Sequence, residues 1–114
     1  MGDGSRSFVF FSNLVYFYST NSIMSNRHYK IIVKGKVQGV AYRFNAQAQA
    51  TRYDLNGFVR NLPNGDVYIE AEGEEENINN FISWCQTGPR LAEVTEVIAE
   101  EGELKMFSSF ELKR

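Results

Sequence analysis

An arginine in the stretch from Val37 to Ala46, VQGVAYRFNA, is the first residue whose type and position suggest chemistry. The stretch follows an apolar run and precedes an alanine-rich segment, so a strand ends and a helix begins within it. The first N–H groups of a helix have no intrahelical partner and, together with the helix dipole, attract anions. Gly39 allows successive amides to converge, and the Arg43 side chain, in the first turn, points back over the same loop. A guanidinium beside converging amides matches the oxygens of a phosphate, so the stretch predicts a phosphate site.

Asn61 is the second candidate, near the end of a strand expected over Phe58–Leu62. The period of two in a strand puts Asn61 on the same face as Val59. If that face meets the helices, the carboxamide lies at the mouth of the phosphate site. A carboxamide accepts a hydrogen bond from water and donates one to an oxygen, but it is no useful general base.

These residues offer hydrogen-bond donors and an orienting group, but no base and no metal ligands. His28 is the only histidine and Cys85 the only cysteine, so no site of soft metal ligands can be assembled from this sequence. Phosphoryl transfer depends mostly on positioning and charge stabilisation. It needs no strong acid when the leaving group is good, as when an acyl phosphate releases a carboxylate. A simple phosphate ester would normally need a proton donor for its leaving oxygen.

Two helices and five strands are expected to position these residues. Alternation and turn signals predict strands over Tyr29–Lys36, Phe58–Leu62, Asp66–Glu72, Ala92–Ala99 and Phe107–Leu112. Apolar spacing predicts helices over Arg43–Tyr53 and Glu74–Gln86. The order is that of an α+β, ferredoxin-like βαββαβ sandwich, an antiparallel sheet with two helices on one face, plus a short C-terminal strand. In that plan the third strand lies between the first two, so the loop after the first strand and Asn61 share one edge.

Length and charge set limits on the class of protein. A chain of 114 residues fits one domain with a real core, and a net charge of −2 gives no reason to expect nucleic acid or a membrane surface as partner. Residues 28–61 hold six basic side chains against one acid, whereas residues 62–114 hold four against twelve. The first region can attract a small anion despite the acidic whole. The lone Cys85 suits a reducing compartment, and we expect a cytoplasmic monomer.

The N-terminal segment differs from the rest. Residues 8–18, FVFFSNLVYFY, are mostly apolar but too short to span a bilayer, which takes about 20 residues. We interpret residues 1–23 as a non-native-like or disordered extension and residues 24–114, from Met24, as the functional domain. A misassigned start and a secretory signal peptide both stay open for the extension.

Two stretches closely resemble the signatures of the acylphosphatase family. VKGKVQGVAYR is similar to the first, a strand, a Gln-Gly loop and an arginine, and GFVRNLPNGDVYIEAEG to the second, with the asparagine and the hairpin. Phe81, Trp84 and the pair Gly88-Pro89 match the second helix and the following turn. The resemblance runs from about His28 to Arg114. Two departures are mild: Ala41-Tyr42 precedes the arginine, and Asp54 stands where glycine is frequent.

The resemblance implies hydrolysis of acyl phosphates to a carboxylate and inorganic phosphate, with no metal and no cofactor. It implies that Arg43 binds the phosphate and that Asn61 places the attacking water. It makes the phosphate cradle from the backbone amides of Gln38, Gly39, Val40, Ala41, Tyr42 and Arg43. The partner would be a small-molecule acyl phosphate or inorganic phosphate.

Two alternatives stay open beside a free-standing enzyme. One is the acylphosphatase-like module of a larger carbamoyl-transfer maturation enzyme, which we do not expect because no zinc-finger pattern follows the domain. The other is a non-catalytic anion- or RNA-binding ferredoxin-like module. The outward side chains of the third strand, Tyr68, Glu70 and Glu72, disfavour it because the two carboxylates would repel RNA. His28 lies at the far end of the first strand, and we interpret it as a surface residue. Trp84 and Cys85 are interpreted as packing residues.

Overall fold

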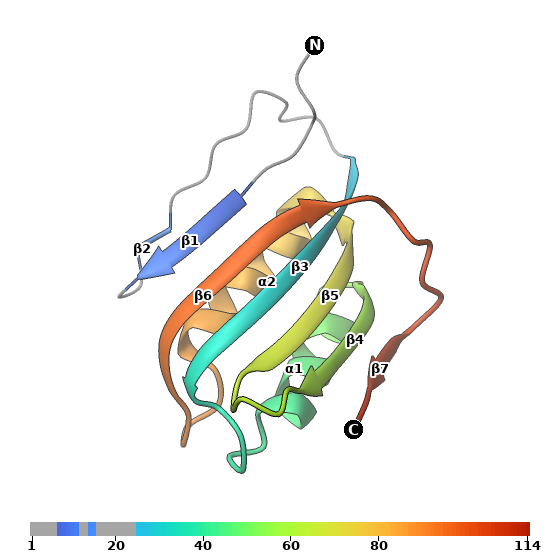
Figure 1. Ribbon diagram of the computed structural model, residues 1–114. Coiled ribbons are helices and arrows are strands. Elements are labelled where there is room, and N and C mark those ends of the chain that lie inside the picture. The colour runs from blue at the N-terminus through green and yellow to red at the C-terminus, as the bar shows by residue number, and fades with distance from the viewer. Residues whose placement is uncertain (1–6, 12–13, 16–24) are drawn as a thin grey trace.

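The computed structural model describes residues 7–11, 14–15 and 25–114. The strands are β1 Ser7–Phe11, β2 Leu14–Val15, β3 Asn26–Lys36, β4 Asn56–Asn61, β5 Val67–Glu74, β6 Glu93–Gly102 and β7 Phe110–Leu112. The helices are α1 Tyr42–Arg52 and α2 Glu75–Thr87. One sheet in the order β2-β1-β6-β3-β5-β4-β7 carries both helices on one face (Figure 1). The ferredoxin-like prediction is confirmed.

The core lies between that sheet and the two helices. Alternate side chains of the central strands point into it, so Tyr29, Ile31 and Val33 of β3 are fully buried. Ala46 and Ala50 of α1 let this helix approach the sheet closely, and α2 contributes the larger Ile78, Phe81 and Ile82. Cys85 is buried in the same core and Trp84 is packed against it. The prediction that these two residues serve packing is confirmed.

β5 lies between β3 and β4, and it is antiparallel to both. β3 and β4 therefore run in the same direction, and their C-terminal ends meet at one edge of the sheet. The hairpin between β4 and β5 closes there with two backbone hydrogen bonds, Leu62 N to Asp66 O at 2.8 Å and Gly65 N to Leu62 O at 3.1 Å. Gly65 has a φ of 100°, a conformation that glycine adopts at little cost. The shared edge predicted from the element order is present.

The last strand makes the sheet mixed rather than wholly antiparallel. β7 pairs with β4 in parallel, with Gly57 opposite Phe110 and Val59 opposite Leu112. The reason is the path of the chain after β6. Residues 103–109, which we call the strap, cross the sheet on the side away from the helices and bring the chain to the outer side of β4 (Figure 1). β7 is also shorter than predicted, because Phe107 lies in the strap and not in the strand.

Part of the predicted N-terminal extension can be described. β1 pairs antiparallel with β6, with Val9 opposite Ile98, and β2 pairs with β1. Residues 1–6, 12–13 and 16–24 lie outside the described residues, so most of the predicted extension 1–23 does too. The domain boundary at Met24 stays a prediction.

His28 is fully buried, and its interpretation as a surface residue was wrong. Its ring lies between two carboxylates of β5, with Nδ1 2.8 Å from Glu72 Oε2 and Nε2 3.0 Å from Glu70 Oε1. The strap covers all three side chains, and the ring of Phe107 lies 5.9 Å from that of His28. The burial comes from contacts far apart along the chain, which strand periodicity does not report.

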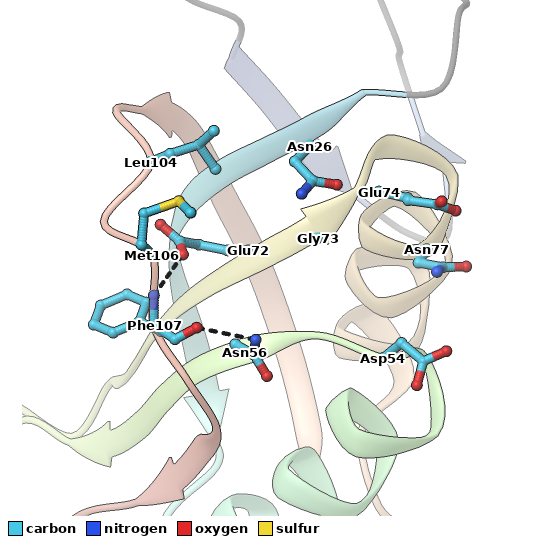
Figure 2. A pocket seen from close by; sticks show the side chains of 10 residues that line it. All are labelled: Asn26, Asp54, Asn56, Glu72, Gly73, Glu74, Asn77, Leu104, Met106 and Phe107. Carbon is cyan, nitrogen blue, oxygen red and sulfur yellow. Dashed lines mark hydrogen bonds between the residues drawn. The ribbon is translucent and has the colours of Figure 1, made fainter.

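The strap is fixed to the sheet mainly by Glu72. Its carboxylate accepts hydrogen bonds from the backbone N–H of Lys105 and from that of Phe107, the latter at 2.9 Å. Asn56 Nδ2 donates to Phe107 O at 3.0 Å (Figure 2). Burial alone would raise the pKa of Glu72, but these two N–H groups and His28 outweigh it and lower the pKa below the ordinary value. The cluster therefore holds the strap with charge-assisted hydrogen bonds.

Candidate active site

The loop after β3 has a backbone suited to binding an anion. Gly39 has a φ of 75°, and Ala41, which precedes the first helical residue, has a φ of 62°. The left-handed region strains a non-glycine residue by about 1–3 kcal/mol and is frequent at functional sites. No side chain caps α1, and its first turn carries no acid. The N–H groups of that turn thus have no intrahelical acceptor and no competing carboxylate.

Two side chains anchor this loop. Gln38 Nε2 donates to Leu62 O at 2.8 Å and to Asp66 O at 2.9 Å, which ties the loop to the β4–β5 hairpin. At the other end Tyr42 is buried, and its hydroxyl donates to Cys85 O at 2.9 Å. Burial raises the pKa of Tyr42 well above its ordinary value, so the phenol stays a donor. The sequence predicts a role only for the backbone amides of Gln38 and Tyr42, whereas in the structure their side chains also position the loop.

Arg43 and Asn61 line one cavity of about 170 Å³ at the shared edge. The full lining is Val37, Gly39, Ala41, Tyr42, Arg43, Phe44, Asn61 and Leu112. Of the predicted site residues, five therefore come together on this cavity. Gln38 anchors the loop from outside it, and the side chain of Val40 is buried in the core.

The polar side chains of the cavity are held at defined places. Arg43 Nη1 donates to the backbone oxygen of Lys113 at 2.7 Å, so the segment after β7 fixes one side of the guanidinium. Asn61 Oδ1 is buried and accepts no hydrogen bond from any residue that the structure describes. A buried acceptor of this kind calls for a partner, and a water or ligand in the cavity would supply one. The carboxamide can therefore orient a water.

The charge of this site is positive and its lining contains no acid. Arg43 is the one charged side chain among the eight described lining residues, which include no Asp, Glu, His or Cys. Burial raises the pKa of the Cys85 thiol to about 12, so it is a poor nucleophile. Among the described residues, no group of three or more His, Cys, Asp or Glu side chains is arranged to hold a metal ion. What the cavity offers is amide and guanidinium donors with one orienting carboxamide.

A larger cavity, of about 320 Å³, lies at the opposite edge, where β3 and β4 begin (Figure 2). Asn26, Asn56, Asp54, Glu72 and Glu74 contribute polar groups to its lining, beside Met106 and Phe107. Its three carboxylates oppose an anion. The larger of the two cavities is therefore less suited to bind a phosphate than the smaller one.

The fold and this cavity define a class of protein, a ferredoxin-like domain with a loop suited to bind an anion at the start of α1. The family model that matches the chain is Acylphosphatase, over residues 29–112. The chain belongs to the acylphosphatase family. None of the described helices has the length and apolar character needed to cross a membrane.

Relatives and solved structures agree with this assignment. An acylphosphatase of Acaryochloris marina is 45% identical over 85 residues, which are 75% of this chain and 91% of that protein. One of Vibrio parahaemolyticus is 42% identical over 83 residues, 73% of this chain and 92% of its own length. The structure of an acylphosphatase from Coxiella burnetii matches with a TM-score of 0.76 and 35% identity, over 77% of this chain and 93% of that one. Full-length HypF matches with a TM-score of 0.75 and 33% identity over 81% of this chain, but over only 12% of HypF.

Proposed function

We propose that this protein hydrolyses acyl phosphates to a carboxylate and inorganic phosphate. One observation carries the proposal: an uncapped helix start with a strained loop faces the same small cavity as Arg43 and Asn61. The names of the relatives support it, since proteins called acylphosphatase share 41–45% identity over most of their length.

In the proposed mechanism the backbone amides from Gln38 to Arg43 and the Arg43 guanidinium bind the phosphate oxygens. These donors are in place before the substrate arrives, because Gln38 and Tyr42 anchor the loop and Lys113 O holds the guanidinium. Preorganised donors stabilise the charge that spreads over the phosphoryl oxygens in the transition state. Binding and charge stabilisation then come from the same groups.

Asn61 places the nucleophile in this proposal. Its Oδ1 accepts a hydrogen bond from a water, which attacks phosphorus in line with the bond to the acyl oxygen. The new P–O bond forms as the old one breaks, and the carboxylate leaves with its electron pair. One proton of the water stays on the attacking oxygen, which becomes a phosphate oxygen, and the other moves to a second phosphate oxygen. Because the carboxylate is a weak base, it needs no general acid, in keeping with a cavity lining without one.

We propose that the reaction needs neither metal nor cofactor, because the amides and Arg43 supply the positive charge and the leaving group needs no Lewis acid. The test is hydrolysis of benzoyl phosphate by the full chain in the presence of a chelator. We expect the rate with chelator to equal the rate without it. Loss of activity on metal removal, restored by adding a divalent cation, would contradict the metal-free mechanism.

We also propose that the protein is a cytoplasmic monomer that binds neither nucleic acid nor a membrane. The RNA-binding alternative is disfavoured because the strap covers the outer face of β5, where Glu70 and Glu72 are buried beneath Lys105 and Phe107. A buried Cys85 agrees with a reducing compartment. Light scattering of the purified chain measures the oligomeric state directly, and a dimer would contradict this part of the proposal.

A further inference from the structure

Two large apolar side chains remain exposed at the rim of the candidate active site. Phe44 is 67% exposed and Leu112 is 38% exposed, and both line the same cavity as Arg43 and Asn61. Phe44 directly follows Arg43 on α1, whereas Leu112 comes from β7, next to Val59 of β4. Two segments far apart in the chain therefore bring apolar surface to one place.

The core does not account for Phe44. Tyr42, two residues earlier, is buried against Trp84, and Ala46, two residues later, is fully buried against the sheet. These residues fix the orientation of α1, and Phe44 lies on its outward side. A ring left in water beside a polar cavity points to a ligand that covers it.

The small size of the cavity restricts that ligand. About 170 Å³ is below the 300–1,000 Å³ of ordinary small-molecule sites. In the proposed complex the phosphate is bound by the loop amides and Arg43. The acyl group is joined to the phosphate through one bridging oxygen, so it must lie against the residues of the cavity that do not bind the phosphate. Apart from Asn61, the side chains left in that lining are mainly apolar, and the largest exposed ones are Phe44 and Leu112. A second charge on the acyl group would have no partner there, because Arg43 is already engaged by the phosphate.

We propose that Phe44 and Leu112 form an acyl-group subsite that selects acyl phosphates with a small, uncharged, apolar acyl group. This inference rests on the proposed function and names its substrate class. Phe44 is the stronger determinant, because its ring offers the larger exposed surface and sits beside the phosphate-binding arginine.

The test compares benzoyl phosphate with acetyl phosphate in the wild type and in Phe44→Ala. Alanine favours a helix more than phenylalanine does and the ring is mostly exposed, so we expect the variant to fold. The ratio of kcat/KM for benzoyl over acetyl phosphate should fall about 3- to 10-fold, the effect of losing one ring contact. Phe44→Leu, which keeps apolar surface, should give an intermediate ratio. Met106→Ala is the matched control: it removes an 81% exposed apolar side chain at the other cavity and should leave the ratio unchanged.

Uncleavable analogues separate this inference from the proposed function. Phenacylphosphonate and acetonylphosphonate replace the bridging oxygen of benzoyl and acetyl phosphate with a methylene group. The wild type should bind the phenacyl compound more tightly, and Phe44→Ala should reduce that preference. If both acyl phosphates are hydrolysed and Phe44→Ala changes neither ratio, the subsite is refuted while the proposed function stands. If neither is hydrolysed, the proposed function fails, and the ratio of the Kd values of the two phosphonates in the wild type and in Phe44→Ala decides whether Phe44 binds an acyl group.

Discussion

The two edges of this sheet treat their polar groups in opposite ways. At the edge where β3 and β4 end, the helix start is uncapped, Asn61 Oδ1 has no partner among the described residues and Ala41 is strained. At the edge where they begin, Glu72 accepts two backbone N–H groups and approaches His28, and the strap covers them. One edge keeps polar groups available for a ligand, and the other uses them to hold the chain together. In the proposed function, chemistry and stability are thus carried by different ends of the same strands.

Replacing Arg43 should break the active edge alone. In Arg43→Ala we expect kcat/KM for benzoyl phosphate to fall about 10²–10³-fold, the usual effect of losing a preorganised donor, together with weaker phosphate binding. The unfolding free energy should change little. Arg52→Ala, at the exposed C-terminal end of α1, is the control and should keep full activity. Equal losses in the two variants would mean that Arg43 acts only through the general positive field.

Replacing Asn61 should separate the two tasks at that edge. Asn61→Ala removes the proposed orienter of the water, so we expect kcat to fall about 10²-fold while the Kd for inorganic phosphate stays close to that of the wild type. Steady-state kinetics and calorimetric titration with phosphate measure the two quantities. Asn80→Ala, on the exposed side of α2, is the control. A parallel loss of phosphate affinity in Asn61→Ala would contradict the division of roles between Asn61 and Arg43.

Replacing Glu72 should damage the other edge. Glu72→Gln puts an amide donor among groups that already donate, so we expect the unfolding free energy to fall by about 2 kcal/mol. Because β7 is held separately, through Gly57 N to Ser109 O and Lys113 N to Val59 O, kcat should fall less than twofold. Denaturant unfolding measures the free energy. Glu103→Gln, which changes an exposed carboxylate in the strap, is the matched control and should leave it nearly unchanged. If kcat of Glu72→Gln falls by more than the fraction of unfolded protein accounts for, the two edges are coupled.

The pH dependence of the unfolding free energy should arise in part from the carboxylates at the edge that the strap covers. Burial would raise the pKa of Glu70, but hydrogen bonds from Lys105 Nζ and the Tyr68 hydroxyl outweigh it and lower the pKa, as happens for Glu72. A carboxyl with a lower pKa in the folded state stabilises the fold above its unfolded pKa, near 4.3, and loses that contribution as the pH falls through the folded pKa. We expect the unfolding free energy to fall below about pH 5. The slope of the unfolding free energy against pH should be smaller in Glu72→Gln. An unchanged slope would mean that the Glu72 carboxylate does not contribute to this pH dependence.

Local signals in the sequence predict the fold well, and they place the candidate site residues on one edge of the sheet. The Asn64-Gly65 hairpin and the element order together put the loop before Arg43 beside Asn61, because strands with one direction end at one edge. The left-handed conformation of Asp54, with a φ of 55°, also follows from its place at a helix end.

Contacts between distant segments are what the sequence did not predict. The burial of His28 depends on the strap crossing the sheet, and the role of the Gln38 side chain depends on two carbonyl groups that exist only once the hairpin has formed. The parallel pairing of β7 likewise follows from the strap's path. Periodicity reports which face a residue takes, but not which later segment covers that face.

The most direct test of the phosphate cradle is a ¹H–¹⁵N NMR titration of the full chain with inorganic phosphate in the presence of a chelator. We expect the amide signals from Gly39 to Arg43 to shift together and saturate at one Kd, while those of Lys105 and Phe107 stay in place. In Arg43→Ala the same shifts should need much higher phosphate. Shifts confined to the edge with Glu72 and the strap, or no saturable shift in the loop, would contradict the central claim.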